Sequence, residues 1–412
     1  MSAIRSLLIP VTLLLAACSR EQPPVDPQLA AAIAGIKAID NHAHPVLAAP
    51  GDREFDALPV DHMEPQSDPV AMRPGAFQPP FTDESKAAAK RERGDRYPAW
   101  VLDQMGVEIM LANRVAMGTS VQPPRFRWVP YADALIFPLD NAHLAAKNSD
   151  RKAFFALEDK LRARYLAEAG LSAPPATLAE YLARVVTPTL ERHKQGGAVA
   201  EKFEAAYLRS LAFDAADAAQ AARVYHERSP SDAHYKVLQD YLFRYIAAEC
   251  GRLGMAVHLH TAAGAGGYFD VAGADPLNLE PVLNDPALRK TKFVMVHGGW
   301  PFTREITPLL SKPNAYLDFS AQSLLLSPAA LAGILREWLE HVPEKVMFAT
   351  DGYPYSNELG WEESSWISAR NGREALGRAL TAMLRDGAIT HTRAVELARM
   401  VLRENARALY GL

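Results

Sequence analysis

The sequence has little cysteine and no strongly basic segment. Its 412 residues include two cysteines, Cys18 and Cys250, and Cys18 lies in a leader segment that we expect to be processed. With only Cys250 left in the folded part, no intramolecular disulfide can form, so stability must come from the core and any bound metal. Lys and Arg number 44 against 48 Asp and Glu, for a formal net charge of -4. Without a basic stripe, we expect no nucleic-acid partner.

Length and composition fit a soluble enzyme. Hydrophobic residues make up 49% of the chain and charged residues 22%, values that are ordinary for a globular protein. The length allows two average domains or one large α/β barrel, which typically has roughly 250 residues and tolerates insertions to over 400. Either arrangement can bury a sizeable core.

The first twenty residues read as a targeting signal. Arg5 is followed by the apolar run Leu7 to Leu15 and then by Leu15-Ala16-Ala17-Cys18. The apolar run is too short to span a membrane, and its ending resembles the bacterial lipobox, in which the cysteine carries lipid. We therefore expect a lipoprotein signal peptide at 1–17, a lipidated tether at 18–28, and a membrane anchor on Cys18. Ser19 favours the outer membrane, facing the periplasm; the alternative is an ordinary signal peptide with a chance cysteine.

Short apolar runs that we interpret as strands alternate with helical stretches along the rest of the chain. This alternation predicts parallel βαβ units, and about eight such strands favour an α/β fold of the TIM-like (β/α)8 barrel type over an open sheet. The predicted strands lie around 39–44, 107–111, 127–137, 196–202, 255–261, 293–297, 315–319 and 346–351.

Two insertions interrupt the barrel pattern. At about 45–98, prolines, glycines and aspartates break any regular period, which predicts a long loop after the first strand, with one helix around Asp83 to Arg93. At about 140–195, apolar residues recur at three- and four-residue spacing over 152–169 and 178–194, as in amphipathic helices. We therefore predict a single barrel spanning 29–412, with a helical insertion beside its mouth.

The first predicted strand ends in two histidines one residue apart, in Ile39-Asp40-Asn41-His42-Ala43-His44. Residues i and i+2 of a strand point to the same face, so both imidazoles project together. This arrangement is half of a metal site, although two histidines at a strand end are also compatible with an incidental polar junction. Asp40 and Asn41 are candidates to orient the neighbouring imidazoles.

Further candidate ligands stand at the ends of later predicted strands, where barrel enzymes carry their working groups. They are Lys202, His260, His297 and Asp351 on the fourth, fifth, sixth and eighth strands. Each has a structural alternative: Lys202 could pair with Glu201 or Glu204, and Asp351 could cap a helix. His258 precedes His260 by two residues and reads as a buried histidine one layer deeper.

This order of motifs resembles the amidohydrolase superfamily, of the amidohydrolase-2 type, and in particular the amidohydrolase domain of nodulin-like and FluG-like proteins. The resemblance covers roughly Ile36 to the C-terminus. It is carried by Asp40-Asn41-His42-Ala43-His44, Lys202-Phe203-Glu204-Ala205-Ala206-Tyr207, His260-Thr261, Val296-His297 with Pro301-Phe302-Thr303-Arg304-Glu305, Tyr316-Leu317-Asp318-Phe319 and Thr350-Asp351-Gly352-Tyr353.

The resemblance implies a metal centre with two divalent cations. The ligands would be His42, His44, His260, His297 and Asp351, and Lys202 would carry a carbamate that bridges the cations. Zinc suits imidazole and carboxylate ligands best, with manganese or iron as alternatives. A metal-activated hydroxide would attack the substrate, with His297 at the centre and Asp351 as proton shuttle. Without the carbamate, the same residues support a single-metal site in which His297 is free to contact substrate.

The expected function is hydrolysis of an amide or related C–N bond in a small-molecule substrate. Alternatives are a metal-dependent decarboxylase or lactonase of the same superfamily, or a non-catalytic binding lipoprotein. The insertions carry no motif that identifies the substrate. Candidate substrate contacts, each equally compatible with packing or a helix-start salt bridge, are Arg209, Trp300, Arg304 and Tyr353.

Overall fold

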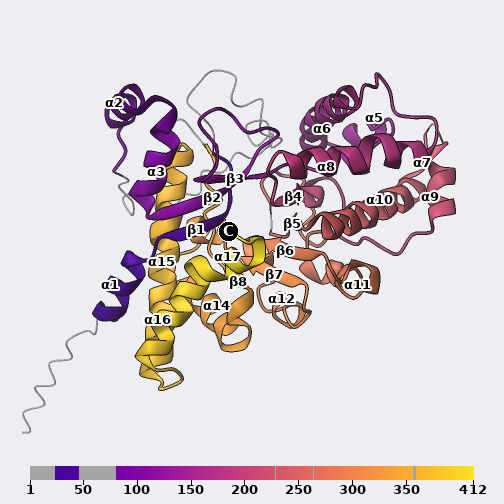
Figure 1. The fold of residues 1–412 in the computed structure, drawn as a ribbon. Coiled ribbons are helices and arrows are strands. Elements are labelled where there is room, and N and C mark those ends of the chain that lie inside the picture. Colours follow the sequence, from indigo (N-terminus) through magenta and orange to yellow (C-terminus); the bar gives the residue numbers. More distant parts are fainter. Residues whose placement is uncertain (1–23, 46–79, 228, 263, 356–358) are drawn as a thin grey trace, which may run out of the picture.

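Eight parallel strands form the centre of the protein (Figure 1). The computed structural model describes residues 24–45, 80–227, 229–262, 264–355 and 359–412. In chain order, β1 (Ala38–Ala43), β2 (Val107–Asn113) and β3 (Phe126–Val129) form one sheet. The second sheet, also in chain order, contains β4 (Ala200–Phe203), β5 (Ala256–His260), β6 (Lys292–Val296), β7 (Ala315–Asp318) and β8 (Val346–Met347).

Backbone hydrogen bonds join the two sheets along both edges. Between β3 and β4, Val199 N–H donates to the Trp128 carbonyl at 3.0 Å and Ala132 N–H to the Lys202 carbonyl at 2.9 Å. Between β1 and the segment after β8, Asn41 N–H donates to the Phe348 carbonyl at 3.0 Å. With both edges paired, the strands close into a ring, which confirms the predicted TIM-like barrel.

The lumen of the barrel is filled at one end by small and branched side chains. Almost every strand contributes to this cluster, which contains Ile39, Leu111, Val129, Ala200, Ala256, Val294, Val296 and Met347. Helix α17 (Asn405–Tyr410) packs Ala406, Leu409 and Tyr410 against it, and Figure 1 shows α17 beside the strands. The packed lumen leaves the opposite end, where the strands finish, for chemistry.

Helices between β3 and β5 gather on one side of the barrel in Figure 1. In the predicted insertion, α6 and the run from α7 to α8 match the two helices expected at 152–169 and 178–194. The helix α10 begins where the Ser231 side chain accepts the His234 N–H and ends at left-handed Gly254, two common helix signals. The helices are α4 (Asp133–Ile136), α5 (Ala142–Ala145), α6 (Ser149–Glu168), α7 (Leu178–Tyr181), α8 (Thr187–Gln195), α9 (Ala218–Tyr225) and α10 (Asp232–Leu253).

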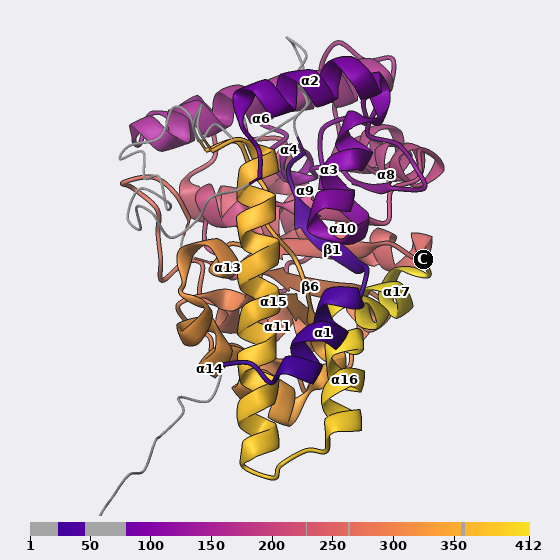
Figure 2. The same cartoon turned by 90° about the vertical axis from the view of Figure 1, so that its left-hand side faces the viewer.

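The remaining helices cover the other strands. The longest, α15 (Trp361–Arg385), carries Glu362 and Glu363 in its first turn and Arg385 in its last, which complements the helix dipole. Figure 2 shows α15 with α1 (Pro27–Gly35) and α16 (His391–Arg399) beside it. The others are α2 (Asp83–Arg93), α3 (Tyr97–Met105), α11 (Glu280–Leu283), α12 (Ile306–Leu309), α13 (Gln322–Leu325) and α14 (Pro328–His341); α2 coincides with the helix predicted in the first insertion.

The structure corrects the third predicted strand. β3 ends at Val129, and α4 occupies the end of the range predicted as strand at 127–137. Pro130 explains the early end, because proline has no N–H with which to continue the ladder. The predicted signal peptide, the tether up to residue 23 and loop residues 46–79 lie outside the described residues. Among the described residues, no helix has the length and apolar character needed to cross a bilayer.

A methyl group at Gly352 should disturb the junction between β8 and β1. An alanine Cβ there would lie 2.9 Å from Ser365 Cβ and 3.3 Å from Ser365 Cα in α15. We expect Gly352→Ala to lower the free energy of unfolding by about 1–3 kcal/mol in chemical denaturation, the usual range for overpacking. Gly333→Ala in α14 is the control, because no atom lies within 4 Å of its added Cβ. It should be neutral or stabilising, and equal stability of the two variants would contradict this account.

Candidate metal centre

Two histidines from the end of β1 and an aspartate after β8 bring three ligand atoms together. The Nε2 atoms of His42 and His44 lie 3.3 Å apart, and they lie 3.1 and 3.5 Å from Asp351 Oδ1. Candidate ligand atoms of the three residues all fall within 4.8 Å of one another. We call these residues the primary triad. Asp351 N–H donates to the His42 carbonyl at 2.9 Å and His44 N–H to the Gly352 carbonyl at 2.8 Å, so barrel closure sets the triad's spacing.

His260 and His297 border the primary triad. The His297 ring lies 5.0 Å from the His42 ring and 4.6 Å from the His260 ring, measured between centroids. His297 Nδ1 is 3.8 Å from Asp351 Oδ2. All five residues predicted as imidazole or carboxylate ligands therefore surround one buried space, with Asp351 at its more open side.

Burial gives these histidines the protonation state that metals require. It lowers the pKa of His260 to about 4 and holds the pKa values of His42 and His297 well below the usual range. Burial alone would raise the pKa of Asp351, but His297 and the hydrogen bonds from His42 and His44 hold it well below its usual range. Neutral imidazoles and an ionised carboxylate are the ligand forms of these side chains, so the residues present fit a divalent cation.

Lys202 lies among the same side chains and is fully buried in β4. Its positive charge helps to lower the pKa values of His42, His260 and His297, so Lys202 lies close to these three rings. Its ammonium, however, forms an ion pair with Glu204 rather than with Glu201, whose partner is His193.

Further buried acids surround this ion pair. Asp133 Oδ2 accepts the Glu204 N–H at 2.7 Å. Burial raises the pKa of Asp133 to about 8, and burial together with nearby acids raises that of Glu158. Asp133 and Glu158 therefore lie beside the ion pair of Lys202 with Glu204.

The outward-facing ring atoms of the histidines have polar neighbours from adjacent strands. His42 Nδ1 lies 2.7 Å from Asn113 Nδ2, and His44 Nδ1 lies 2.9 Å from Tyr131 Oη. Such contacts fix ring orientation in metal sites. The sequence did not point to Asn113 or Tyr131, although each stands at or just after the end of a neighbouring strand.

His297 is held by the segment that follows β7. Its N–H donates to Asp318 Oδ1 at 3.0 Å, and its carbonyl accepts from Gln322 Nε2 at 2.7 Å. Ser320 Oγ donates to Asp318 Oδ1 and lies 2.8 Å from His297 Nδ1. Because the hydroxyl proton is given to the carboxylate, Ser320 can only accept from His297, which places the imidazole hydrogen on Nδ1.

The side chains of Asp40 and Asn41 form hydrogen bonds that link strands of the barrel, and they do not contact the imidazole rings directly. Asp40 accepts the Thr350 N–H at 3.0 Å and the Thr350 hydroxyl at 2.6 Å, and Asn41 donates to Asp318 Oδ2 at 2.6 Å. His258 lies 2.7 Å from the Tyr410 hydroxyl through Nε2, deeper in the lumen.

Of the predicted substrate contacts, Tyr353 is brought to the centre. Its ring meets the His44 ring edge-on, with centroids 5.6 Å apart. Arg209 instead pairs with Asp240 at 2.5 Å, and Arg304 has a side chain that is 84% exposed and pairs with Glu337. Trp300 is half-buried just after His297. A residue that the sequence did not reveal, Tyr207, places its ring 4.7 Å from that of His260.

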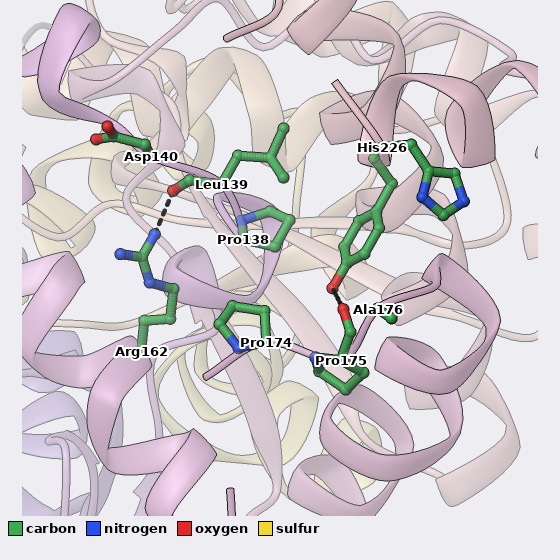
Figure 3. A pocket seen from close by; sticks show the side chains of 9 residues that line it. Pro138, Leu139, Asp140, Arg162, Pro174, Pro175, Ala176 and His226 are labelled. Atoms are coloured by element: carbon green, nitrogen blue, oxygen red, sulfur yellow. Dashed lines mark hydrogen bonds between the residues drawn. The ribbon is translucent and has the colours of Figure 1, made fainter. Parts of the chain in front are cut away.

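A separate pocket lies in the helical insertion and contains none of the predicted site residues. Its volume is about 450 Å³, and it is lined by Pro138, Leu139, Asp140, Arg162, Pro174, Pro175, Ala176, Tyr225 and His226. Arg162 donates to the Leu139 carbonyl, as Figure 3 shows. Tyr225 donates to the Pro175 carbonyl at 2.9 Å. Since these polar groups bond to backbone carbonyls, we place the chemistry at the primary triad.

Known proteins share sequence and fold with this chain. The amidohydrolase family model matches residues 146–412. FluG of Emericella nidulans is 29% identical over 184 residues, a match that covers 43% of this chain and 20% of FluG. A solved structure of a predicted metal-dependent hydrolase from Lactobacillus casei has a TM-score of 0.63 and 17% identity, covering 93% of this chain and 97% of that chain. Uronate isomerase from Thermotoga maritima has a TM-score of 0.59 and 14% identity, covering 93% and 96%; these two structures show the shared fold alone.

Removing the Ser320 hydroxyl should release the His297 ring. We expect Ser320→Ala to shift the ring-nitrogen NMR signals of His297 towards a mixture of tautomers and to cost about 1–3 kcal/mol of unfolding free energy, since Asp318 loses a buried partner. Ser323→Ala is the matched control, because its hydroxyl is also buried but has no hydrogen-bond partner. Unchanged His297 signals in Ser320→Ala would contradict the assigned proton position.

Proposed function

This chain belongs to the amidohydrolase family, and we propose that it is a metal-dependent hydrolase that cleaves an amide or related C–N bond. The observation that carries the proposal is the primary triad, in which two imidazoles and a carboxylate converge in a buried site. Zinc suits this ligand set best, with manganese or iron as alternatives. When bound, such a cation polarises a substrate carbonyl and lowers the pKa of water.

The side chains around the triad supply the remaining steps. Asp351 Oδ1 faces His42 and His44, whereas Oδ2 faces His297, so Oδ2 is placed to take a proton from the attacking water and pass it to the leaving nitrogen. His297 Nδ1, at 3.8 Å, stabilises the Asp351 carboxylate before it takes the proton. Tyr207 and Tyr353 line the site beside His260 and His44 and exclude solvent from the reacting bond.

The number of cations is part of the proposal. We propose two, the first on the primary triad and the second beside His260 and His297. The alternative is a single-metal site without a carbamate on Lys202, which a decarboxylase or lactonase of the same superfamily would also use. Metal analysis and product identification separate these possibilities, because only C–N hydrolysis releases an amine. A panel of acyl amino acids, dipeptides and γ-glutamyl amides is the natural first screen.

Asp351→Asn should abolish hydrolysis while leaving most of the metal bound. The amide oxygen can still act as a ligand but the side chain cannot accept a proton, so we expect a loss of roughly 10²-fold or more in kcat. Asp285→Asn, at a carboxylate paired with Arg244, is the control and should retain activity. Full activity of Asp351→Asn would remove it from proton transfer, and wild-type protein with less than about half an equivalent of any transition metal would contradict the catalytic proposal.

We also propose that the protein is anchored to the outer membrane, facing the periplasm, by lipid on Cys18. The Leu15-Ala16-Ala17-Cys18 sequence supports this. Radiolabelled lipid should attach to the wild-type chain in bacteria and not to Cys18→Ser, as detected by gel autoradiography. A Cys250→Ser variant should be labelled like wild type, and labelling of Cys18→Ser would contradict the anchor.

A further inference from the structure

We propose that Glu204 is a ligand for the second divalent cation and binds it together with His260. In this arrangement Glu204 takes the place that the sequence assigned to a carbamate on Lys202, and Lys202 stays an ammonium. The inference rests on the proposed function, since it concerns the second cation of the same centre.

The first step is the position of the hydrogen on His260. Its Nε2 lies 3.0 Å from the carbonyl oxygen of Ala262. A carbonyl oxygen can only accept a hydrogen bond, so Nε2 carries the hydrogen and Nδ1 of the neutral ring presents a lone pair. The ring is therefore oriented with Nδ1 as its only ligand atom.

The second step is what faces that lone pair. His260 Nδ1 lies 3.4 Å from Glu204 Oε2, and Oε2 is buried with no hydrogen-bond partner among the described residues. Glu204 as a whole is only 1% exposed. Two acceptors that face each other in a buried site, with no donor between them, are unfavourable unless a cation or proton lies there.

The third step is that the rest of Glu204 is fixed by other contacts. Its Oε1 is the partner of the Lys202 ammonium, and its N–H donates to Asp133. These contacts direct Oε2 alone toward His260. The His297 ring, 4.6 Å from that of His260, is available for a third contact, and Tyr207 covers the opposite face of the site.

The charges around Lys202 fit this assignment. The ammonium is paired with Glu204 Oε1, which leaves Oε2 for the cation. A cation at Oε2 then receives a carboxylate oxygen, the ligand that a carbamate would otherwise provide. No chemical modification of the chain is needed to complete the centre.

Zinc stoichiometry of the full-length protein tests the proposal. Metal-free wild type, Glu204→Gln, Lys202→Met and Glu158→Gln would each be titrated with Zn²⁺ in bicarbonate-free and in bicarbonate-containing buffer, and bound metal measured by mass spectrometry. We expect two equivalents in wild type, Lys202→Met and Glu158→Gln, and one in Glu204→Gln, without bicarbonate dependence. Glu158 is the matched control because it is also a buried glutamate whose Oε2 has no hydrogen-bond partner.

The opposite results distinguish the failures. Two equivalents in folded Glu204→Gln, or loss of the second equivalent in Lys202→Met with dependence on bicarbonate, would overturn the role of Glu204. One equivalent in wild type would overturn the second site and leave the proposed function standing, whereas none would remove both. If Glu204→Gln fails to fold, anomalous diffraction from Co²⁺-loaded wild-type crystals must show a peak between His260 Nδ1 and Glu204 Oε2, and its absence overturns the proposal.

Discussion

The metal centre depends on backbone hydrogen bonds that join the segment after β8 to β1. They place Asp351 and Gly352 in register with His42 and His44, although these residues lie near opposite ends of the chain. A slip of one residue in β1 would turn His42 to the other face of the strand and separate the triad. Asp40 reinforces the register by accepting both the N–H and the hydroxyl of Thr350. Closure of the barrel therefore stabilises the fold and also sets the distances between the residues of the primary triad.

A second constraint is that the polar side chains buried at the metal centre all need hydrogen-bond partners. Buried donors and acceptors need partners, and here the partners come from the ends of neighbouring strands. Asn113, Tyr131 and Ser320 each contact the Nδ1 atom of a histidine, which fixes the orientation of the three rings. The same burial keeps the imidazoles neutral, so one physical cause supplies both the orientation and the protonation state that a cation requires.

The contacts of Lys202 bear on a question that the sequence motif leaves open, namely which chemical form this lysine takes. A lysine at the end of the fourth strand is compatible with a carbamate or an ammonium. In the structure its ammonium is paired with the buried Glu204 carboxylate. Glu204 then presents one oxygen to Lys202 and the other to His260. In the proposed centre, Lys202 balances the charge of one Glu204 oxygen, and the other oxygen binds the cation.

The sequence by itself determined the barrel, the order of its strands and the ligand types. Residues such as His42, His44, His260 and Asp351 follow short apolar runs, and that local pattern is enough to place them at strand ends. Only the tertiary structure decided which side chains meet. It directed Arg209 to Asp240 and Arg304 to Glu337, and it brought Glu204, Tyr131 and Ser320 to the histidines. The spacing of apolar residues along the chain indicates burial and strand direction. Contacts between strand ends depend instead on register, twist and barrel closure, which involve residues far apart in the sequence.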